Sequence, residues 1–173
     1  FKLIAESVSI DQILYNVPGR TAVDMSVDTT SRLSEISNII GIKDATGDLS
    51  VIKELVAKCP EDFLLLTGDD ATAIDFLLLG GHGGISVTAN VTPRELQKAY
   101  LAAIAGNTEL AKKLNEGLSG LHKNLFIESN PIPVKWALHK MGKCDNGIRL
   151  PLLELSNECK TVLENDLKEL NLI

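Results

Sequence analysis

Cysteine and histidine are scarce in this chain. Its 173 residues include three cysteines, Cys59, Cys144 and Cys159, and three histidines, and none has the spacing of a zinc site or a redox pair. The odd number of cysteines argues against a disulfide framework and favours free thiols in a reducing compartment. We therefore expect a cytoplasmic protein with no metal site and no cofactor.

Long apolar runs and an excess of basic residues are also absent. No segment reaches the ~18 apolar residues of a membrane-spanning helix, and the amino terminus lacks the pattern of a signal peptide. Lysine and arginine number 17 against 23 aspartates and glutamates, a net charge of -6 that argues against a nucleic-acid partner. With 45% hydrophobic residues, the composition predicts an ordinary globular protein with no membrane partner.

Short apolar runs alternate with amphipathic helical stretches in the first half of the chain. Strand-length runs, each followed by a helical pattern, are expected over Gln12–Asn16, Ile39–Ile42, Phe63–Thr67 and Gly84–Thr88. This alternation predicts an α/β fold with a parallel sheet. After Pro93 the pattern predicts a tail of about three or four helices, with breaks near Gly106, Asn130–Pro133 and Asn146–Pro151.

Capping residues indicate where several helices begin. Ser26 is expected to cap a helix through about Ile36, and Asp70 to cap a helix over residues 71–79. Another helix is expected over Leu49–Lys58. Its buried face is expected to consist of Leu49, Ile52, Leu55 and Val56.

Lys43 places a primary amine where the apolar run Ile39–Ile42 ends and a turn begins. The carboxyl ends of parallel strands are where barrel enzymes keep their catalytic residues. An apolar strand also disfavours the charged ammonium form of the side chain. A nucleophile requires the neutral amine. The alternative is a solvated flanking lysine whose charge extends to water.

Tyr15 and Arg20 lie at the end of the preceding strand, which Pro18 interrupts. An amine, a phenol and a guanidinium at one edge of a sheet form a coherent site for a carbonyl substrate. They can act as the nucleophile for a Schiff base, as a proton shuttle and as a fork for a carboxylate. These three side chains together favour the catalytic interpretation of Lys43.

Two other motifs allow a functional and a structural interpretation. The glycine-rich residues 80–84 resemble a phosphate loop, but they follow a helix and precede a strand, which favours a tight turn. Asp69 and Asp70 could form an acid/base pair, but one capping carboxylate and one exposed loop carboxylate are favoured.

Several segments together resemble the dihydrodipicolinate synthase family, pyruvate-dependent aldolases of lysine biosynthesis. The segments are Tyr-Asn-Val-Pro-Gly-Arg-Thr (15–21), Gly-Ile-Lys-Asp-Ala-Thr-Gly (41–47), Leu-Thr-Gly-Asp-Asp (66–70), Gly-Gly-Ile-Ser-Val-Thr-Ala-Asn-Val (83–91) and Asn-Pro-Ile-Pro-Val-Lys-Trp-Ala (130–137). The resemblance implies a TIM (β/α)8 barrel, of which this chain has only the last four βα units. A complete barrel needs at least about 200 residues.

The resemblance also implies how the chain is divided. Residues 1–92 would form the second half of the barrel, and residues 93–173 the last barrel helix and a carboxyl-terminal helical extension. Residues 1–9 look like the end of a helix, so the chain is expected to begin in the middle of the fold.

The function implied by the resemblance is the condensation of pyruvate with L-aspartate 4-semialdehyde to 4-hydroxy-tetrahydrodipicolinate. Lys43 would form the imine with pyruvate, Tyr15 would move protons, and Arg20 would bind the carboxylate of the aldehyde. Gly68 and Ile85 would line the pyruvate pocket. The complete protein would be a homotetramer, and the truncated chain alone is expected to be inactive.

Two alternatives remain open. Sialic-acid lyases and keto-sugar aldolases belong to the same superfamily, although Arg20 favours the synthase. The chain could also be a non-catalytic half-barrel that folds only with a partner, because an open half-barrel exposes unpaired strand edges.

Overall fold

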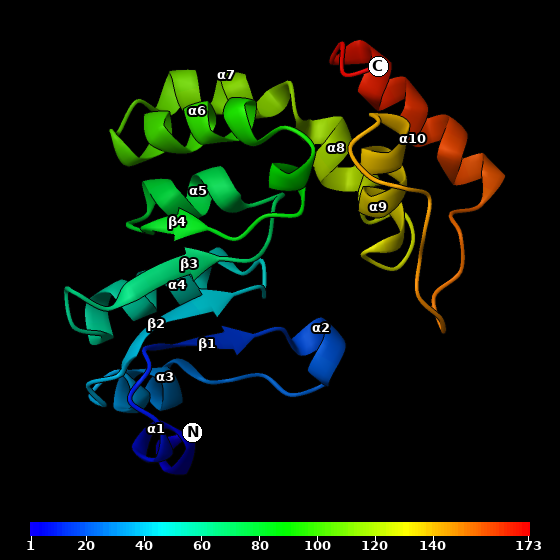
Figure 1. Ribbon diagram of the computed structural model, residues 1–173. Helices are drawn as coiled ribbons and strands as arrows, with labels where there is room; N and C mark the ends of the chain where they lie inside the picture. The colour runs from blue at the N-terminus through cyan, green and yellow to red at the C-terminus, as the bar shows by residue number, and fades with distance from the viewer. The chain divides into compact units, whose positions relative to one another are not determined.

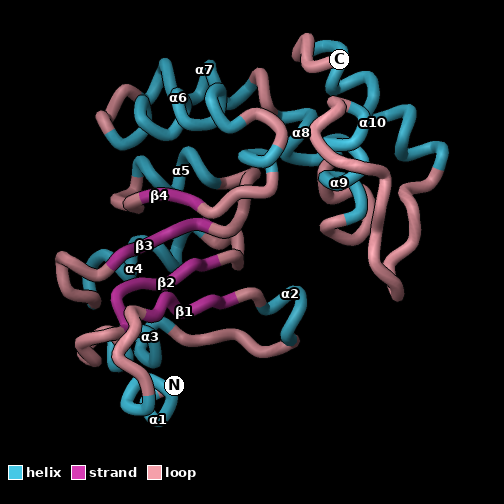
Figure 2. The backbone as a smooth tube through the Cα atoms, viewed as in Figure 1, coloured by secondary structure: helices cyan, strands magenta, loops and turns pink.

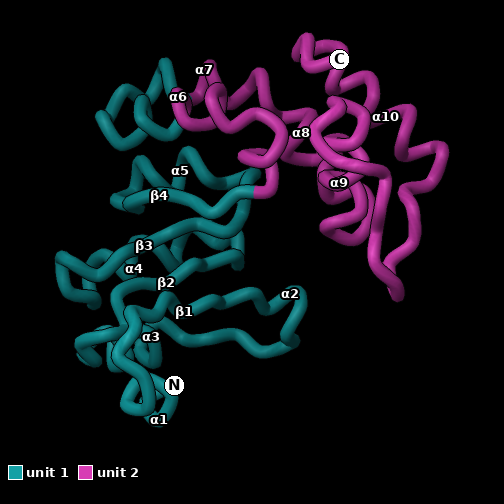
Figure 3. Tube along the Cα trace, viewed as in Figure 1, with its two compact units in different colours: residues 1–86, 100–111 teal, residues 87–99, 112–173 magenta.

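The computed structural model describes residues 1–173, which divide into two compact units (Figure 3). Unit 1 comprises residues 1–86 and 100–111, and unit 2 comprises residues 87–99 and 112–173. The predicted boundary between residues 92 and 93 separates barrel from helical extension in the complete protein, and it stays a prediction. No helix combines the length and apolar character that crossing a membrane requires.

Unit 1 contains a four-stranded parallel sheet in the order β1-β2-β3-β4 (Figures 1 and 2). Its strands are β1 Gln12–Asn16, β2 Ile39–Asp44, β3 Leu64–Thr67 and β4 Gly83–Gly84. The predicted parallel sheet is therefore confirmed. Because all neighbouring strands are parallel, the carboxyl ends of all four strands lie at one edge of the sheet.

Three strands differ from the predicted bounds, and β3 differs least, since it begins at Leu64 rather than at Phe63. β2 extends beyond Ile42 because Lys43 and Asp44 still pair with β1 on one side and β3 on the other. The fourth strand was predicted over Gly84–Thr88 but is only two residues long, which corrects that prediction. β3 ends at Thr67, opposite Gly84, so the residues that follow have no partner strand. Thr88–Asn90 form the 3₁₀ helix η1 instead.

The first five helices are α1 Lys2–Ser7, α2 Pro18–Thr21, α3 Val27–Leu33, α4 Leu49–Lys58 and α5 Ala73–Leu78. All except α2, which was not predicted, lie close to a segment that was predicted to be helical. The hydroxyl of Ser26 accepts the Thr29 N–H and caps α3, as predicted, although this helix ends at Leu33. α4 has the predicted bounds, and Asp48 caps it.

Asp69, rather than Asp70, holds the turn before α5. The carboxylate of Asp69 accepts the Thr72 backbone N–H at 3.0 Å and the Thr72 hydroxyl at 2.7 Å. The helix begins at Ala73, later than predicted. Asp69 therefore lies at the distance along the chain, three residues before Thr72, from which a carboxylate can accept a backbone N–H at the start of a helix. Asp70 is buried instead. The prediction that Asp70 caps this helix was therefore wrong.

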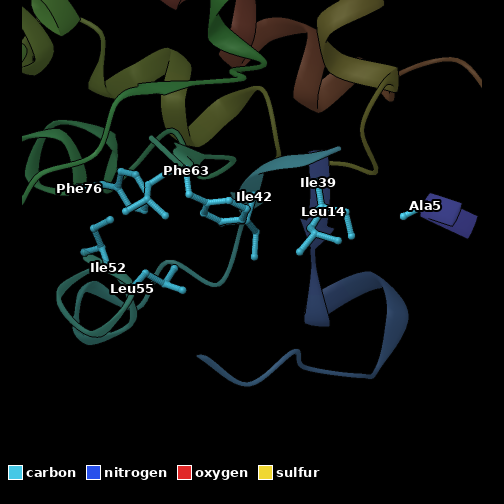
Figure 4. Packing of buried hydrophobic residues seen from close by; sticks show 9 residues of the cluster. Ala5, Leu14, Ile39, Ile42, Ile52, Leu55, Phe63 and Phe76 are labelled. Atoms are coloured by element: carbon cyan, nitrogen blue, oxygen red, sulfur yellow. The ribbon is translucent and has the colours of Figure 1, made fainter. Parts of the chain in front are cut away.

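One face of the sheet packs against helices to form the core of unit 1. Leu14, Ile42 and Leu65 from the strands meet Ile52 and Leu55 from α4 (Figure 4). The predicted buried face of α4 is confirmed except for Val56, which is 47% exposed. Val56 lies against Gly80, which has no side chain to cover it.

The other face of the sheet carries Tyr15 on β1 and Lys43 on β2. Successive residues of a strand point to opposite faces, so these residues lie on the reverse side from Leu14 and Ile42. Tyr15 is 49% exposed and Lys43 is partly buried. The sheet thus has one apolar, helix-covered face and one more open face with ionisable side chains.

From Pro93 onward the chain is helical, as predicted, but with five helices rather than three or four. They are α6 Pro93–Ile104, α7 Thr108–Glu116, α8 Ser119–Asn124, α9 Ile132–Lys140 and α10 Asn157–Glu169. The extra break lies between α7 and α8, at Gly117 and Leu118. The core of unit 2 includes Leu121, Val134 and Leu163.

Candidate active site

Tyr15 and Lys43 are direct neighbours on adjacent parallel strands. Their Cα atoms are paired in the register of β1 and β2, and Lys43 Nζ lies 4.1 Å from the centroid of the Tyr15 ring. At this distance the ring face attracts the ammonium group. The two residues predicted to be catalytic are therefore brought together by the sheet itself.

Gly68 lies against the side chain of Lys43. A Cβ atom at Gly68 would be 2.6 Å from Lys43 Cε and 2.9 Å from the Ala45 Cβ. The Gly68 N–H also donates to the Asp44 carbonyl at 2.6 Å, which ties the turn after β3 to the end of β2. Glycine at this position therefore leaves the space that the aliphatic part of Lys43 occupies.

Arg20 and Ile85 lie just beyond the carboxyl ends of the two outer strands. Arg20 is on the exposed helix α2, and no hydrogen bond or ring contact joins its guanidinium to Tyr15 or Lys43. Ile85 directly follows β4, is 48% exposed, and donates its backbone N–H to the Thr67 carbonyl. Of the predicted site residues, only Tyr15, Lys43 and Gly68 are in contact.

A row of polar residues lies on the helix-covered face behind this site. Asn16, Asp44 and Thr67 are the last residues of β1, β2 and β3, and all three are buried. Sequence reasoning missed them. The available signal was their position, because each continues the alternation of Leu14, Ile42 and Leu65 but is polar.

Asn16 and Asp44 are joined by a buried hydrogen bond. The Asn16 amide donates to Asp44 Oδ2 at 3.0 Å and to Asp24 Oδ1 at 2.8 Å, and its carbonyl oxygen accepts the Met25 N–H at 3.1 Å. Asp44 Oδ1 accepts the N–H and the hydroxyl of Thr46. Both oxygens of the buried carboxylate thus have donors, as a charge removed from water requires.

Behind β4, Tyr100 packs against Gly84. A Cβ atom at Gly84 would lie 2.8 Å from the Tyr100 ring and hydroxyl. Burial, followed by the negative charges of Asp70 and Asp69, raises the pKa of the Tyr100 phenol far above its ordinary value of 10.0, and the Ser86 side chain opposes the shift. Tyr100 therefore stays protonated and serves as packing for β4.

Comparison with known proteins shows which family this chain is similar to. The Dihydrodipicolinate synthetase family matches residues 1–170. The 4-hydroxy-tetrahydrodipicolinate synthase of Ruthia magnifica subsp. Calyptogena magnifica is 62% identical over 173 residues, which are all of this chain and 58% of that protein. The Pseudomonas aeruginosa enzyme of the same name is 56% identical over 169 residues, or 98% of this chain and 58% of that protein.

A solved structure has the same fold. The dihydrodipicolinate synthase of Acinetobacter baumannii, crystallised with pyruvate, superposes with a TM-score of 0.96 at 52% identity and covers 99% of this chain and 59% of that chain. This chain therefore spans a little under three fifths of the length of its relatives.

The parallel sheet and its likeness to these structures define an α/β protein of the TIM-barrel fold. Its site has a lysine, Lys43, near the carboxyl ends of the parallel strands. The chain belongs to the dihydrodipicolinate synthetase family.

Proposed function

We propose that this chain is the second half of the barrel of a 4-hydroxy-tetrahydrodipicolinate synthase, consisting of the last four βα units and a carboxyl-terminal helical extension. The reaction is the condensation of pyruvate with L-aspartate 4-semialdehyde in lysine and diaminopimelate biosynthesis. The contact of Lys43 with Tyr15 and Gly68 at the carboxyl edge of the sheet carries the proposal. The names of the relatives support it.

Lys43 is the nucleophile in this proposal. Its neutral amine attacks the ketone carbon of pyruvate, and loss of one water molecule leaves an imine. The imine then allows the pyruvate methyl group to lose a proton, and the resulting enamine carbon attacks the aldehyde of the second substrate. Tyr15 lies against Lys43 and moves protons in these steps.

Arg20 binds the carboxylate of L-aspartate 4-semialdehyde in this proposal. A planar guanidinium forms two parallel hydrogen bonds with a carboxylate, which a lysine ammonium cannot do. Arg20 is exposed on α2, directly after the strand that carries Tyr15, so it can meet a substrate that approaches this edge. Gly68 and Ile85 line the pyruvate side of the pocket.

The first half of the barrel closes the open face of the sheet. β1 and β4 are the outer strands, each with one neighbour, and parallel sheets normally have both faces covered. The complete enzyme is a cytoplasmic homotetramer in this proposal, consistent with the free thiols of Cys59, Cys144 and Cys159.

Trapping of the imine tests the proposal. The complete enzyme can be made by expressing residues 1–173 with the part of the Ruthia magnifica relative that they do not cover. Borohydride reduction in the presence of pyruvate should add a pyruvate-derived mass to the peptide that contains Lys43. Lys43→Arg keeps the charge and should abolish labelling, whereas labelling at Lys53 or Lys135 would contradict the assignment.

A further inference from the structure

We infer that Asn16 is a positioning residue that holds Tyr15 opposite Lys43 by bridging β1 to Asp44 and to the segment Asp24–Met25. This inference rests on the proposed function, since it assigns a task within the same site. Asn16 does not face the substrate side of the sheet. It acts through the backbone of β1, which places the Tyr15 side chain.

The register of β1 needs such a bridge. β1 is an outer strand with β2 as its one neighbour, and its register against β2 shifts between Gln12 and Ile13. A slip of one residue would turn every side chain of a strand to the opposite face. Burial of Leu14 already disfavours such a slip, but backbone pairing alone does not fix the end of β1 opposite Lys43.

The side chain of Asn16 removes this ambiguity at the end of the strand. Asn16 is 3% exposed and Asp44 is 4% exposed, and their register pair adjoins the pair of Tyr15 and Lys43. The hydrogen bond between them, 3.0 Å long, forms only when Asn16 faces Asp44. In that register Tyr15 must face Lys43 on the reverse side, because adjacent residues alternate.

Asn16 also ties down the chain that follows β1. The side-chain Nδ2 of Asn16 donates to Asp24, and its side-chain Oδ1 accepts the Met25 backbone N–H. These bonds close the loop of residues 17–24, which includes α2 and Arg20. The buried side chain of Asn16 thus holds in place both the end of β1, which carries Tyr15, and the loop that carries Arg20.

A double-mutant cycle in the complete enzyme separates positioning from general stability. Asn16→Asp keeps the shape of the side chain but replaces the NH2 group, which donates to Asp24 and Asp44, by an oxygen that cannot donate when ionised. We expect the rate of pyruvate imine formation at Lys43 to fall about 10- to 100-fold, the scale of a catalytic group displaced by about 1 Å. In a Tyr15→Phe background the same change should cost at most a few-fold, because the residue acts through Tyr15.

Equal losses in both backgrounds would overturn the inference. Thr46→Val is the matched control, because it removes another donor to Asp44 without touching β1, and it should leave the rate within a few-fold. Asn16→Ala and Asn16→Ser are tested in parallel. Loss of the folded state in all three Asn16 variants would assign the residue to stability alone and would also overturn the inference.

The outcome is distinguishable from failure of the proposed function. If the enzyme with Asn16 intact is not labelled at Lys43, the proposed chemistry is wrong. If it is labelled and the Asn16 variants form the imine at the same rate, the chemistry stands and only the positioning role is refuted.

Discussion

Gly68 and Lys43 show how a single glycine can serve a site by leaving space for a neighbouring side chain. The Cβ of any other residue at position 68 would compete with Lys43 Cε for the same space. The end of the Lys43 side chain is flexible and can move aside, but the Ala45 Cβ, 2.9 Å from the added atom, is fixed to the backbone. A substitution should therefore affect both the chemistry at Lys43 and the stability.

We predict that Gly68→Ala slows imine formation at Lys43 by at least about 10-fold and lowers the free energy of unfolding by about 1 to 3 kcal/mol. The added methyl group would meet Lys43 Cε at 2.6 Å and displace the amine from Tyr15. Stopped-flow or quenched trapping with pyruvate measures the rate, and denaturant unfolding measures the stability. Gly147→Ala, where a Cβ meets nothing within 4 Å, is the control and should change neither. A large loss of stability with normal trapping would contradict this account.

Strand β4 is the shortest element of the sheet, and its packing depends on one helix side chain. Gly83 and Gly84 have no side chains of their own to pack, and Tyr100 of α6 occupies the space beside Gly84. The ionisation state of Tyr100 therefore affects the stability of this element.

We predict that stability declines in alkaline solution partly through Tyr100. The folded state raises the pKa of this phenol above the 10.0 of the unfolded chain, so the stabilisation is complete below about pH 10 and is lost as the pH rises further. Denaturant unfolding of the complete enzyme between about pH 8 and 11 should show a steeper decline than the same measurement on Tyr100→Phe. The lysines titrate in both proteins and cancel in the comparison. Parallel curves would show that the phenol contributes nothing.

The chain as a whole has an open sheet face and two outer strands. Ile13 and Tyr15 are exposed on that face, and β1 and β4 each have one neighbour. Unpaired strand edges beside exposed apolar side chains promote association with other chains.

We predict that the 173 residues expressed alone are inactive and self-associate. The four strands present cannot enclose the site around Lys43, because the rest of the barrel must supply the remaining walls. Light scattering measures the association, and a coupled assay with pyruvate and the aldehyde measures the activity. Adding the uncovered part of the Ruthia magnifica relative in trans should restore activity. A monodisperse, active monomer would refute both parts of this prediction.

Much of the fold and part of the site could be predicted from the residues alone. The apolar runs at β1, β2 and β3, the cap at Ser26 and the bounds of α4 follow from local propensity and periodicity, which depend on neighbouring residues. Lys43 and Tyr15 could be predicted as site residues for the same reason, because a strand end is visible in the sequence. The errors at Asp70, Val56 and β4 share a different cause: each depends on what packs against the residue from elsewhere in the chain.

Local sequence thus determined the element types and the edge of the sheet at which Lys43, Tyr15 and Arg20 would be found. The tertiary structure decided that Tyr15 lies opposite Lys43 and that Gly68 leaves space for the aliphatic part of the Lys43 side chain. It also decided that Asn16 forms a hydrogen bond with Asp44. These contacts depend on the pairing of strands that are far apart in the sequence, since Asn16 and Asp44 are 28 residues apart. Register between such strands is a property of two segments in contact, and neither segment specifies it alone.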